Sequence, residues 1–189
     1  MPHHYFVTGT DTDVGKTFVT RGLLDAFKEQ GLTVFGIKPV ASGSVQTPQG
    51  LRNQDALLLQ NASSFELPYE QVNPFTFEPP IAPHLAAKAV HTPIDVDKLF
   101  EACQPTLSLN ADIVLLEGAG GWYVPLNDRQ TMADFVKKLN IEVILVVRIR
   151  LGCINHALLT YRAIESEGLK VKGWIANEAE PKITVCKEN

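Results

Sequence analysis

Residues 5–17 read Tyr-Phe-Val-Thr-Gly-Thr-Asp-Thr-Asp-Val-Gly-Lys-Thr, a β-prone run that leads into a loop bounded by glycines. The run stops at Gly9, and from Lys16 to Gln30 the apolar residues recur with helical spacing. Gly31 follows, as expected for the C-cap of a helix. This stretch therefore predicts a strand, a loop and a helix in direct succession.

The loop from Gly9 to Thr17 has the residue types of a phosphate-binding P-loop. Between a strand and a helix, successive backbone N–H groups and the helix N-terminus converge on phosphate oxygens. Lys16 would reach the β- and γ-phosphates, and the Thr17 hydroxyl would bind Mg²⁺. The usual motif has one residue fewer between its glycines, and Thr10 stands where its first glycine would fall. We expect a site for a nucleoside triphosphate with magnesium; the alternative is an ordinary strand–helix turn.

Strand-like and helix-like stretches alternate along the rest of the chain. The strand-like runs lie at residues 33–37, 112–116, 143–147 and 171–176, and a helical pattern lies at residues 155–167. A continuous apolar run is typical of a parallel strand buried on both faces. We therefore expect an α/β fold with a mostly parallel β-sheet flanked by helices on both faces. Residues 1–189 would form a single domain, with residues 61–93 as a loop and helix excursion.

The composition is that of an ordinary globular chain and argues against several classes of protein. The chain has 189 residues, of which 45% are hydrophobic and 20% charged, and its net charge is −4. This charge gives no basis for a nucleic-acid or lipid partner, and no apolar run reaches the length of a membrane span. The start of the chain lacks the pattern of a signal peptide. Cys103, Cys153 and Cys186 are odd in number and far apart, so we expect reduced thiols and a cytoplasmic location.

Three polar residues directly follow strand-like runs: Lys38, Glu117 and Asn177. Ligands of open parallel sheets bind beyond the carboxyl ends of the strands, so we expect these residues at the same edge as the P-loop. An acidic residue such as Glu117 at the end of a buried strand suits a magnesium ligand; the alternative is an incidental Glu in a flexible turn. The glycines within residues 118–121 would allow close approach of the backbone to a ligand.

Two further segments leave alternatives open. Asp55 stands in the first turn of a predicted helix capped by Asn53, where it either complements the helix dipole or contacts a ligand. The turn at residues 151–156 joins a strand to a helix, and its N–H groups could hold a carboxylate. Cys153 in that turn is expected to be structural, because only His156 stands beside it as a base.

A series of ordered motifs extends from Tyr5 to Asn177, almost from end to end. They are residues 5–17, 38–43 (Lys-Pro-Val-Ala-Ser-Gly), 52–55 (Arg-Asn-Gln-Asp), 82–84 (Ala-Pro-His), 117–122 (Glu-Gly-Ala-Gly-Gly-Trp), 151–156 (Leu-Gly-Cys-Ile-Asn-His) and 173–177 (Gly-Trp-Ile-Ala-Asn). In this order they resemble the dethiobiotin synthetase family. The wide glycine spacing of the P-loop is the usual form in that family.

The resemblance implies a reaction that consumes ATP. One amine of 7,8-diaminopelargonate would take up CO₂ as a carbamate, and the carbamate oxygen would attack the γ-phosphate of ATP. The second amine would then close the ureido ring on the carbamic–phosphoric anhydride. The products would be dethiobiotin, ADP and phosphate.

The resemblance also implies roles for individual residues. Lys16 and Lys38 would be catalytic, and Mg²⁺ would be held by Thr17, Asp55 and Glu117. The nucleotide would contact Thr12, Asp13, Val14, Gly15, Lys16, Thr17 and, at its adenine edge, Asn177. The diamine and its carbamate would contact Thr12, Lys38, Ser42, Gly118, Ala119 and Gly120. The partner subunit of a homodimer would supply Gly152, Cys153 and Asn155 to hold the distal carboxylate of the substrate.

The chain departs from the family at two places. Family members usually continue with further strand and helix, so residues 178–189 are expected to be a shortened or divergent end that chooses less strictly among nucleotides. Arg148 stands where the family has a small residue; it either points outward, or it blocks or pairs with an anionic ligand. These departures leave a non-catalytic or weakly active paralogue as the alternative. A P-loop nucleotide switch is disfavoured, because such proteins typically carry a lysine where Asp11 stands.

Overall fold

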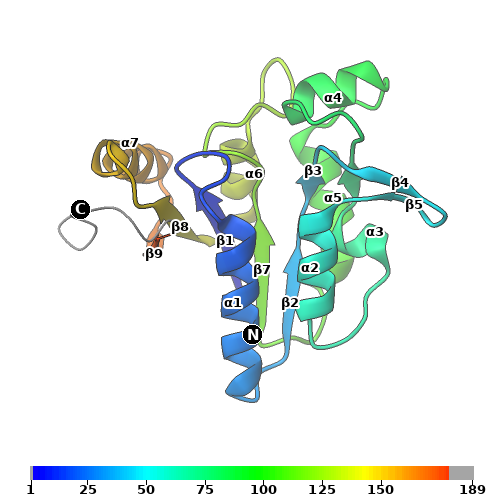
Figure 1. The fold of residues 1–189 in the computed structure, drawn as a ribbon, viewed down its shortest axis with the longest axis horizontal. Helices are drawn as coiled ribbons and strands as arrows, with labels where there is room; N and C mark the ends of the chain where they lie inside the picture. Colours follow the sequence, from blue (N-terminus) through cyan, green and yellow to red (C-terminus); the bar gives the residue numbers. More distant parts are fainter. Residues whose placement is uncertain (1, 179–189) are drawn as a thin grey trace.

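The computed structural model describes residues 2–178 and contains a five-stranded parallel sheet at its centre (Figure 1). The strand order is β2-β7-β1-β8-β9, and each neighbouring pair is parallel. The strands are β1 (His3–Gly9), β2 (Val34–Ile37), β7 (Ile113–Glu117), β8 (Glu142–Arg148) and β9 (Val171–Asn177). Each strand overlaps one of the apolar runs in the sequence, so the predicted α/β fold is confirmed.

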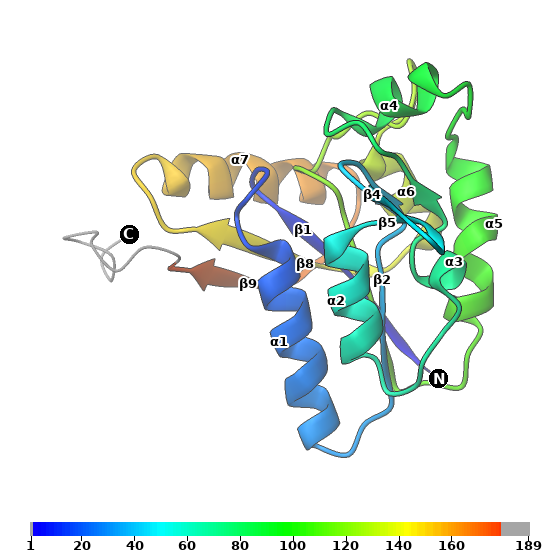
Figure 2. The ribbon, with the colours of Figure 1, turned by 45° about the vertical axis from the view of Figure 1, so that its right-hand side comes forward.

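Helices cover both faces of this sheet. One face is covered by α1 (Lys16–Glu29) and α2 (Gln54–Ala62), and the other by α5 (Val96–Leu107), α6 (Met132–Leu139) and α7 (Cys153–Ser166). On the first face, Leu24 and Leu59 of the helices pack in one apolar cluster with Leu115 of β7. On the second, Phe135 of α6 joins a cluster with Phe6 of β1. Figure 2 shows α7 lying along β8 at the end of the sheet away from α5.

The segment between β2 and α5, which includes the predicted excursion at residues 61–93, contains several short strands and helices. Two short strands, β3 (Val40–Ala41) and β6 (Phe75–Thr76), pair in parallel, and β4 (Val45–Thr47) and β5 (Gly50–Arg52) form an antiparallel hairpin. The helices α3 (Tyr69–Val72) and α4 (Pro83–Ala89) lie within the predicted loop and helix segment. In Figure 1, β3, the β4–β5 hairpin and α4 lie above the carboxyl ends of β2 and β7, whereas α3 lies beside α2.

Caps explain where several helices begin and end. The Asn53 side chain accepts a hydrogen bond from the Ala56 N–H at 3.2 Å, so its predicted role as the N-cap of α2 is confirmed. The prediction for Gly31 was wrong by one position: Gln30 is the C-cap of α1, and Gly31 follows it with φ 80°. Helix α6 was not predicted, although a capping box at Thr131 marks its start.

Two cysteines of the described part are free, buried thiols, as expected. Cys103 on α5 has no exposed surface, and Cys153 is 3% exposed. Burial raises the pKa of the Cys103 thiol to about 12, so almost none of it is thiolate at neutral pH. Cys186 lies outside the described residues.

Cys103 is therefore expected to resist alkylation in the folded protein. Iodoacetamide at pH 8 should leave Cys103 unmodified in native buffer and modify it fully in denaturant, because only the exposed thiolate reacts. Peptide mapping by mass spectrometry reads the modification at each cysteine separately. Rapid native labelling of Cys103 would show that α5 opens readily, against its place in the main apolar cluster.

No helix among residues 2–178 combines the length and the apolar composition needed to cross a membrane.

Candidate functional site

The P-loop connects the end of β1 to the start of α1 at the centre of the sheet edge. Gly15 adopts φ 91° immediately before α1, a left-handed conformation that glycine tolerates far better than other residues. This turn directs the first N–H groups of α1 toward the loop. The Lys16 side chain is buried, and its ammonium donates to the Asp11 carbonyl oxygen at 2.9 Å. The geometry is that of an anion-binding loop at a helix N-terminus, as the sequence indicated.

The ends of β8 and β9 hold the outer side of this loop. The Asn177 side-chain amide donates to the Val14 carbonyl oxygen at 2.8 Å. The Arg150 guanidinium pairs with Asp11 at 2.9 Å. Arg148 is half-buried and donates to the Asp13 carbonyl oxygen at 3.3 Å, so it contacts the P-loop backbone rather than pointing freely outward. Asn177 and Arg148 therefore position the loop, a contact that the sequence did not reveal.

Gly15→Ala is expected to weaken binding of Mg·ATP by at least about tenfold, because the left-handed backbone strains alanine here and a methyl group would displace the Asn177 amide from the loop. A Cβ atom at Gly15 would lie 2.0 Å from the Asn177 Nδ2 atom. Gly168→Ala is the matched control: its φ is 79°, but a Cβ there meets nothing within 4 Å. Calorimetric titration with Mg·ATP should find affinity lost in the first variant and kept in the second. Equal affinities would mean that the loop tolerates the distortion.

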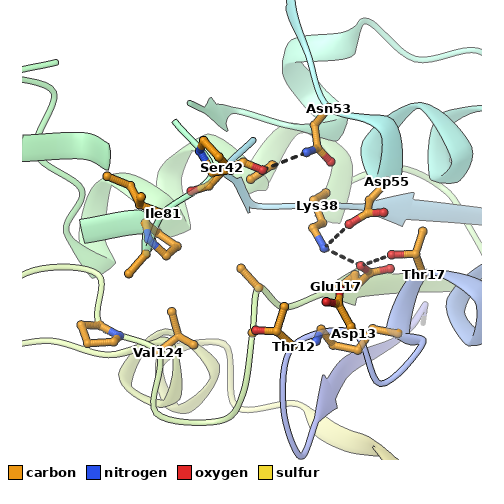
Figure 3. A pocket seen from close by; sticks show the side chains of 18 of the residues that line it. Thr12, Asp13, Thr17, Lys38, Ser42, Asn53, Asp55, Ile81, Glu117 and Val124 are labelled. Atoms are coloured by element: carbon orange, nitrogen blue, oxygen red, sulfur yellow. Dashed lines mark hydrogen bonds and ion pairs between the residues drawn. The ribbon is translucent and has the colours of Figure 1, made fainter. Parts of the chain in front are cut away.

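Four side chains from separate elements meet beside the P-loop (Figure 3). The Lys38 ammonium, just past β2, lies 2.5 Å from Glu117 Oε1 at the end of β7 and 3.2 Å from Asp55 Oδ2 on α2. Thr17, on the first turn of α1, donates its hydroxyl to the same Glu117 oxygen at 2.8 Å. Two carboxylates and a hydroxyl are the hard oxygen donors that suit Mg²⁺. The residues predicted to hold the metal therefore fit that ion.

Charges in this cluster shift two lysine pKa values in opposite directions. Burial pulls the pKa of Lys38 down, but the charges of Glu117 and Asp55 outweigh burial, and the pKa lies above its ordinary value. Burial and, to a lesser degree, the positive charge of Lys38 lower the pKa of Lys16 to about 8. Lys38 is thus already neutralised by carboxylates, whereas Lys16 forms no ion pair with any carboxylate of residues 2–178.

A cavity of about 850 Å³ opens over the P-loop and this cluster. The predicted site residues that line it are Thr12, Asp13, Gly15, Lys16, Thr17, Lys38, Ser42, Asp55, Glu117, Ala119 and Gly120. Gly118 does not line the cavity, but its carbonyl oxygen accepts a hydrogen bond from Lys38 at 3.3 Å. The Ser42 hydroxyl is buried and has no hydrogen-bond partner within residues 2–178. A bound ligand could supply one.

The sequence missed an apolar wall of the same cavity. Pro80, Ile81, Val124 and Pro125 line it, and Figure 3 shows Ile81 and Val124 on the side away from Lys38. These residues come from two loops without helical or strand periodicity. Ala82-Pro83-His84 was recognised as a motif, and its Ala82 and Pro83 also line the cavity, but no role was predicted for them.

The turn before α7 lies apart from the cavity within one chain. Gly152, Cys153 and Asn155 do not line it. The Cys153 side chain packs with Val147 in a small apolar cluster, as expected for a structural cysteine. Leu151 in the same turn is 98% exposed. A single chain therefore does not bring this turn to the predicted substrate.

Comparisons with known proteins show the family to which the chain belongs. A family model described as an AAA domain matches residues 3–188. The ATP-dependent dethiobiotin synthetase BioD of Pseudomonas paraeruginosa is 51% identical over 185 residues, which cover 98% of this chain and 81% of the relative. The protein of that name from Aeromonas salmonicida is 47% identical over 189 residues, covering 100% of this chain and 84% of the relative. The chain belongs to the dethiobiotin synthetase family.

Solved structures show how widely the fold of this dethiobiotin synthetase family member is used. The septum site-determining protein MinD of Pyrococcus horikoshii, complexed with Mg-ADP, has a TM-score of 0.58 at 19% identity, covering 96% of this chain and 72% of that one. The kinase domain of the Escherichia coli tyrosine kinase ETK has a TM-score of 0.55 at 15% identity, covering 96% and 69%. At such identities the likeness shows the fold alone. The roles of individual residues in this dethiobiotin synthetase family member stay predictions.

Proposed function

We propose that the chain catalyses the ATP- and Mg²⁺-dependent conversion of 7,8-diaminopelargonate and CO₂ to dethiobiotin, ADP and phosphate. Family membership supports this reaction, since the relatives are named for it. The observation that carries it is the meeting of Lys16 and Lys38 with two carboxylates in one cavity over the P-loop. Phosphoryl transfer requires charge neutralisation and alignment, and this arrangement supplies both.

The residues of the cavity suggest which groups assist each step of the reaction. One amine adds to CO₂ and loses a proton to give the carbamate, whose oxygen attacks the γ-phosphorus while ADP departs. Lys16 and Lys38 stabilise the charge that develops on the transferred phosphoryl group. The bound Mg²⁺ would neutralise and align the phosphate oxygens. The second amine then attacks the carbamoyl carbon, phosphate leaves, and the amine proton is lost as the ureido ring closes.

The shape of the cavity supports a substrate with a polar end and an alkyl chain. Thr12, Ser42, Ala119 and Gly120 line the cavity and, with the backbone of Gly118, are assigned to the diamine and the carbamate. Ile81 and Val124 provide the apolar side, where methylene groups would be removed from water (Figure 3). A vicinal diamine on an alkyl chain matches this division.

The distal carboxylate of the substrate is assigned to the turn before α7 of a partner subunit. Within one chain this turn does not line the cavity. Two apolar side chains of the turn itself, Leu151 and Ile154, are 98% and 49% exposed. An exposed apolar group on a turn suits an interface between subunits. The homodimer and the cytoplasmic location stay predictions. Light scattering of the purified protein measures its mass in solution and so tests the dimer.

One assay tests the proposed function against its alternatives. The purified protein is incubated with ATP, Mg²⁺, bicarbonate and the diamine, and dethiobiotin is measured by mass spectrometry. We expect dethiobiotin and ADP in equal amounts, and no cyclic product from an analogue in which one amine is replaced by hydrogen. No dethiobiotin despite bound ATP would favour a non-catalytic paralogue. ATP hydrolysis that is independent of the diamine would favour a nucleotide switch.

A further inference from the structure

The Lys38 ammonium lies between the two carboxylates that are assigned to the metal. Its Nζ atom contacts Glu117 Oε1 at 2.5 Å, Asp55 Oδ2 at 3.2 Å and the Gly118 carbonyl oxygen at 3.3 Å. Thr17 donates to the same Glu117 oxygen at 2.8 Å. Lys38 therefore directly contacts oxygens that would hold a divalent cation (Figure 3).

Two cations would compete for these oxygens. Mg²⁺ binds its oxygen ligands at roughly 2.0–2.1 Å, so an ammonium bonded to the same oxygens would lie only a few ångström from the metal. Water screens their repulsion poorly at this place, because Glu117 has no exposed surface and the Lys38 side chain is 5% exposed. Occupancy by one cation therefore disfavours the other.

The second carboxylate oxygen of Glu117, Oε2, is available to a further partner. Oε1 accepts from both Thr17 and Lys38, whereas Oε2 is buried and has no hydrogen-bond partner in the described part of the chain. A buried carboxylate oxygen without a hydrogen-bond donor costs free energy. A cation that contacts Oε2 would remove this cost, which favours its binding. Oε2 is therefore an acceptor for an arriving metal ion that does not depend on the contacts of Lys38.

A displaced Lys38 would have a second place to bind in the same cavity. Lys38 and Lys16 both line it, and the P-loop beside them is suited to phosphate oxygens. The lysine side chain has several rotatable bonds, so its ammonium can change partners without movement of the β2 backbone. An ammonium that leaves two carboxylates for a triphosphate exchanges one set of anionic acceptors for another.

We infer that Lys38 is an exchangeable counter-ion of the metal site: when Mg²⁺ arrives with the triphosphate, the metal takes the carboxylates of Asp55 and Glu117 and Lys38 moves to the phosphate. The inference rests on the magnesium site of the proposed function. It implies that a divalent cation alone binds weakly, because without the triphosphate nothing receives the displaced ammonium.

The test compares binding of Mn²⁺ alone to nucleotide-free protein, measured from the electron paramagnetic resonance signal of free Mn²⁺. Lys38→Met removes the charge and keeps the length of the side chain, so its Mn²⁺ affinity should exceed that of the unmodified protein by at least about tenfold. Lys28→Met is the matched control: its ammonium lies on the surface of α1, 3.3 Å from Asp25, and its affinity should not change. An affinity for Lys38→Met equal to or below that of the unmodified protein would overturn the inference.

Two further measurements keep the test decisive if Lys38→Met is unstable. Mn²⁺ should raise the melting temperature of Lys38→Met more than that of the unmodified protein, since a ligand stabilises in proportion to its affinity for the folded state. In the unmodified protein labelled with ¹⁵N at lysine Nζ, the Lys38 signal should shift with Mg²⁺ and a non-hydrolysable ATP analogue together. An unchanged Lys38 signal would contradict the exchange. None of these readouts needs the diamine. If the unmodified protein makes dethiobiotin but the Lys38 signal shows that its contacts do not change, the exchange is wrong and the proposed function still stands.

Discussion

Replacing Lys16 with alanine is expected to lower kcat/KM for dethiobiotin formation by at least about a thousandfold, because this P-loop cation forms no ion pair within the described part of the chain. Its ammonium donates a hydrogen bond to a neutral carbonyl oxygen, that of Asp11. Its pKa is lowered to about 8, mainly by burial, which means that the surrounding protein disfavours the charged ammonium. A triphosphate would supply an anionic partner for Lys16. Much of the interaction energy of Lys16 can therefore stabilise the reacting phosphoryl group.

The same reasoning predicts little loss of folding stability in Lys16→Ala, because the side chain leaves no buried anion unpaired. Lys28→Ala, at the other end of α1, is the control: its ammonium makes only a surface pair with Asp25, and both activity and stability should stay near those of the unmodified protein. Steady-state kinetics at saturating diamine and urea unfolding measure the two quantities. Lys16→Ala with full turnover would remove the P-loop from the proposed mechanism.

The sequence predicted those parts of the site that local pattern and parallel pairing determine together. Lys38 and Glu117 each follow a buried strand, and the pairing of Ile37 with Leu116 places them at the same edge of the sheet. The P-loop joins that edge because Val7 of β1 pairs with Glu117. No long-range information beyond the parallel arrangement was needed to bring these groups together.

Other parts of the site depend on tertiary contacts that no local pattern encodes. Ile81 and Val124 reach the cavity from two loops without periodicity, so nothing in the sequence marked them as its apolar wall. The contact of Asn177 with Val14 depends on how β9 meets the outer side of the P-loop. For Asp55, local pattern favoured a role in the helix dipole. The structure places its carboxylate 3.2 Å from the Lys38 ammonium, facing the cavity.

Glu117→Gln is expected to lose both activity and stability, which separates Glu117 from Asp55. The glutamine keeps the shape of the side chain and can still accept from Thr17, but it leaves the buried Lys38 ammonium paired only with Asp55, which is 43% exposed. Removing one partner of a buried ion pair costs about 3–5 kcal/mol of folding free energy. Loss of a carboxylate that holds the metal should lower turnover by at least about a hundredfold at ordinary Mg²⁺ concentrations.

Asp55→Asn is the matched variant, because it removes one charge from the same cluster at a half-exposed position. It should lose turnover through the metal site, and higher Mg²⁺ concentrations should restore part of it. Its loss of stability should be clearly smaller than that of Glu117→Gln, since solvent screens the Asp55 carboxylate. Urea unfolding and kinetics over a range of Mg²⁺ concentrations give both comparisons. Equal losses of stability in the two variants would show that burial of Glu117 does not set the strength of its ion pair with Lys38. Full turnover in both variants would show that neither carboxylate holds the metal.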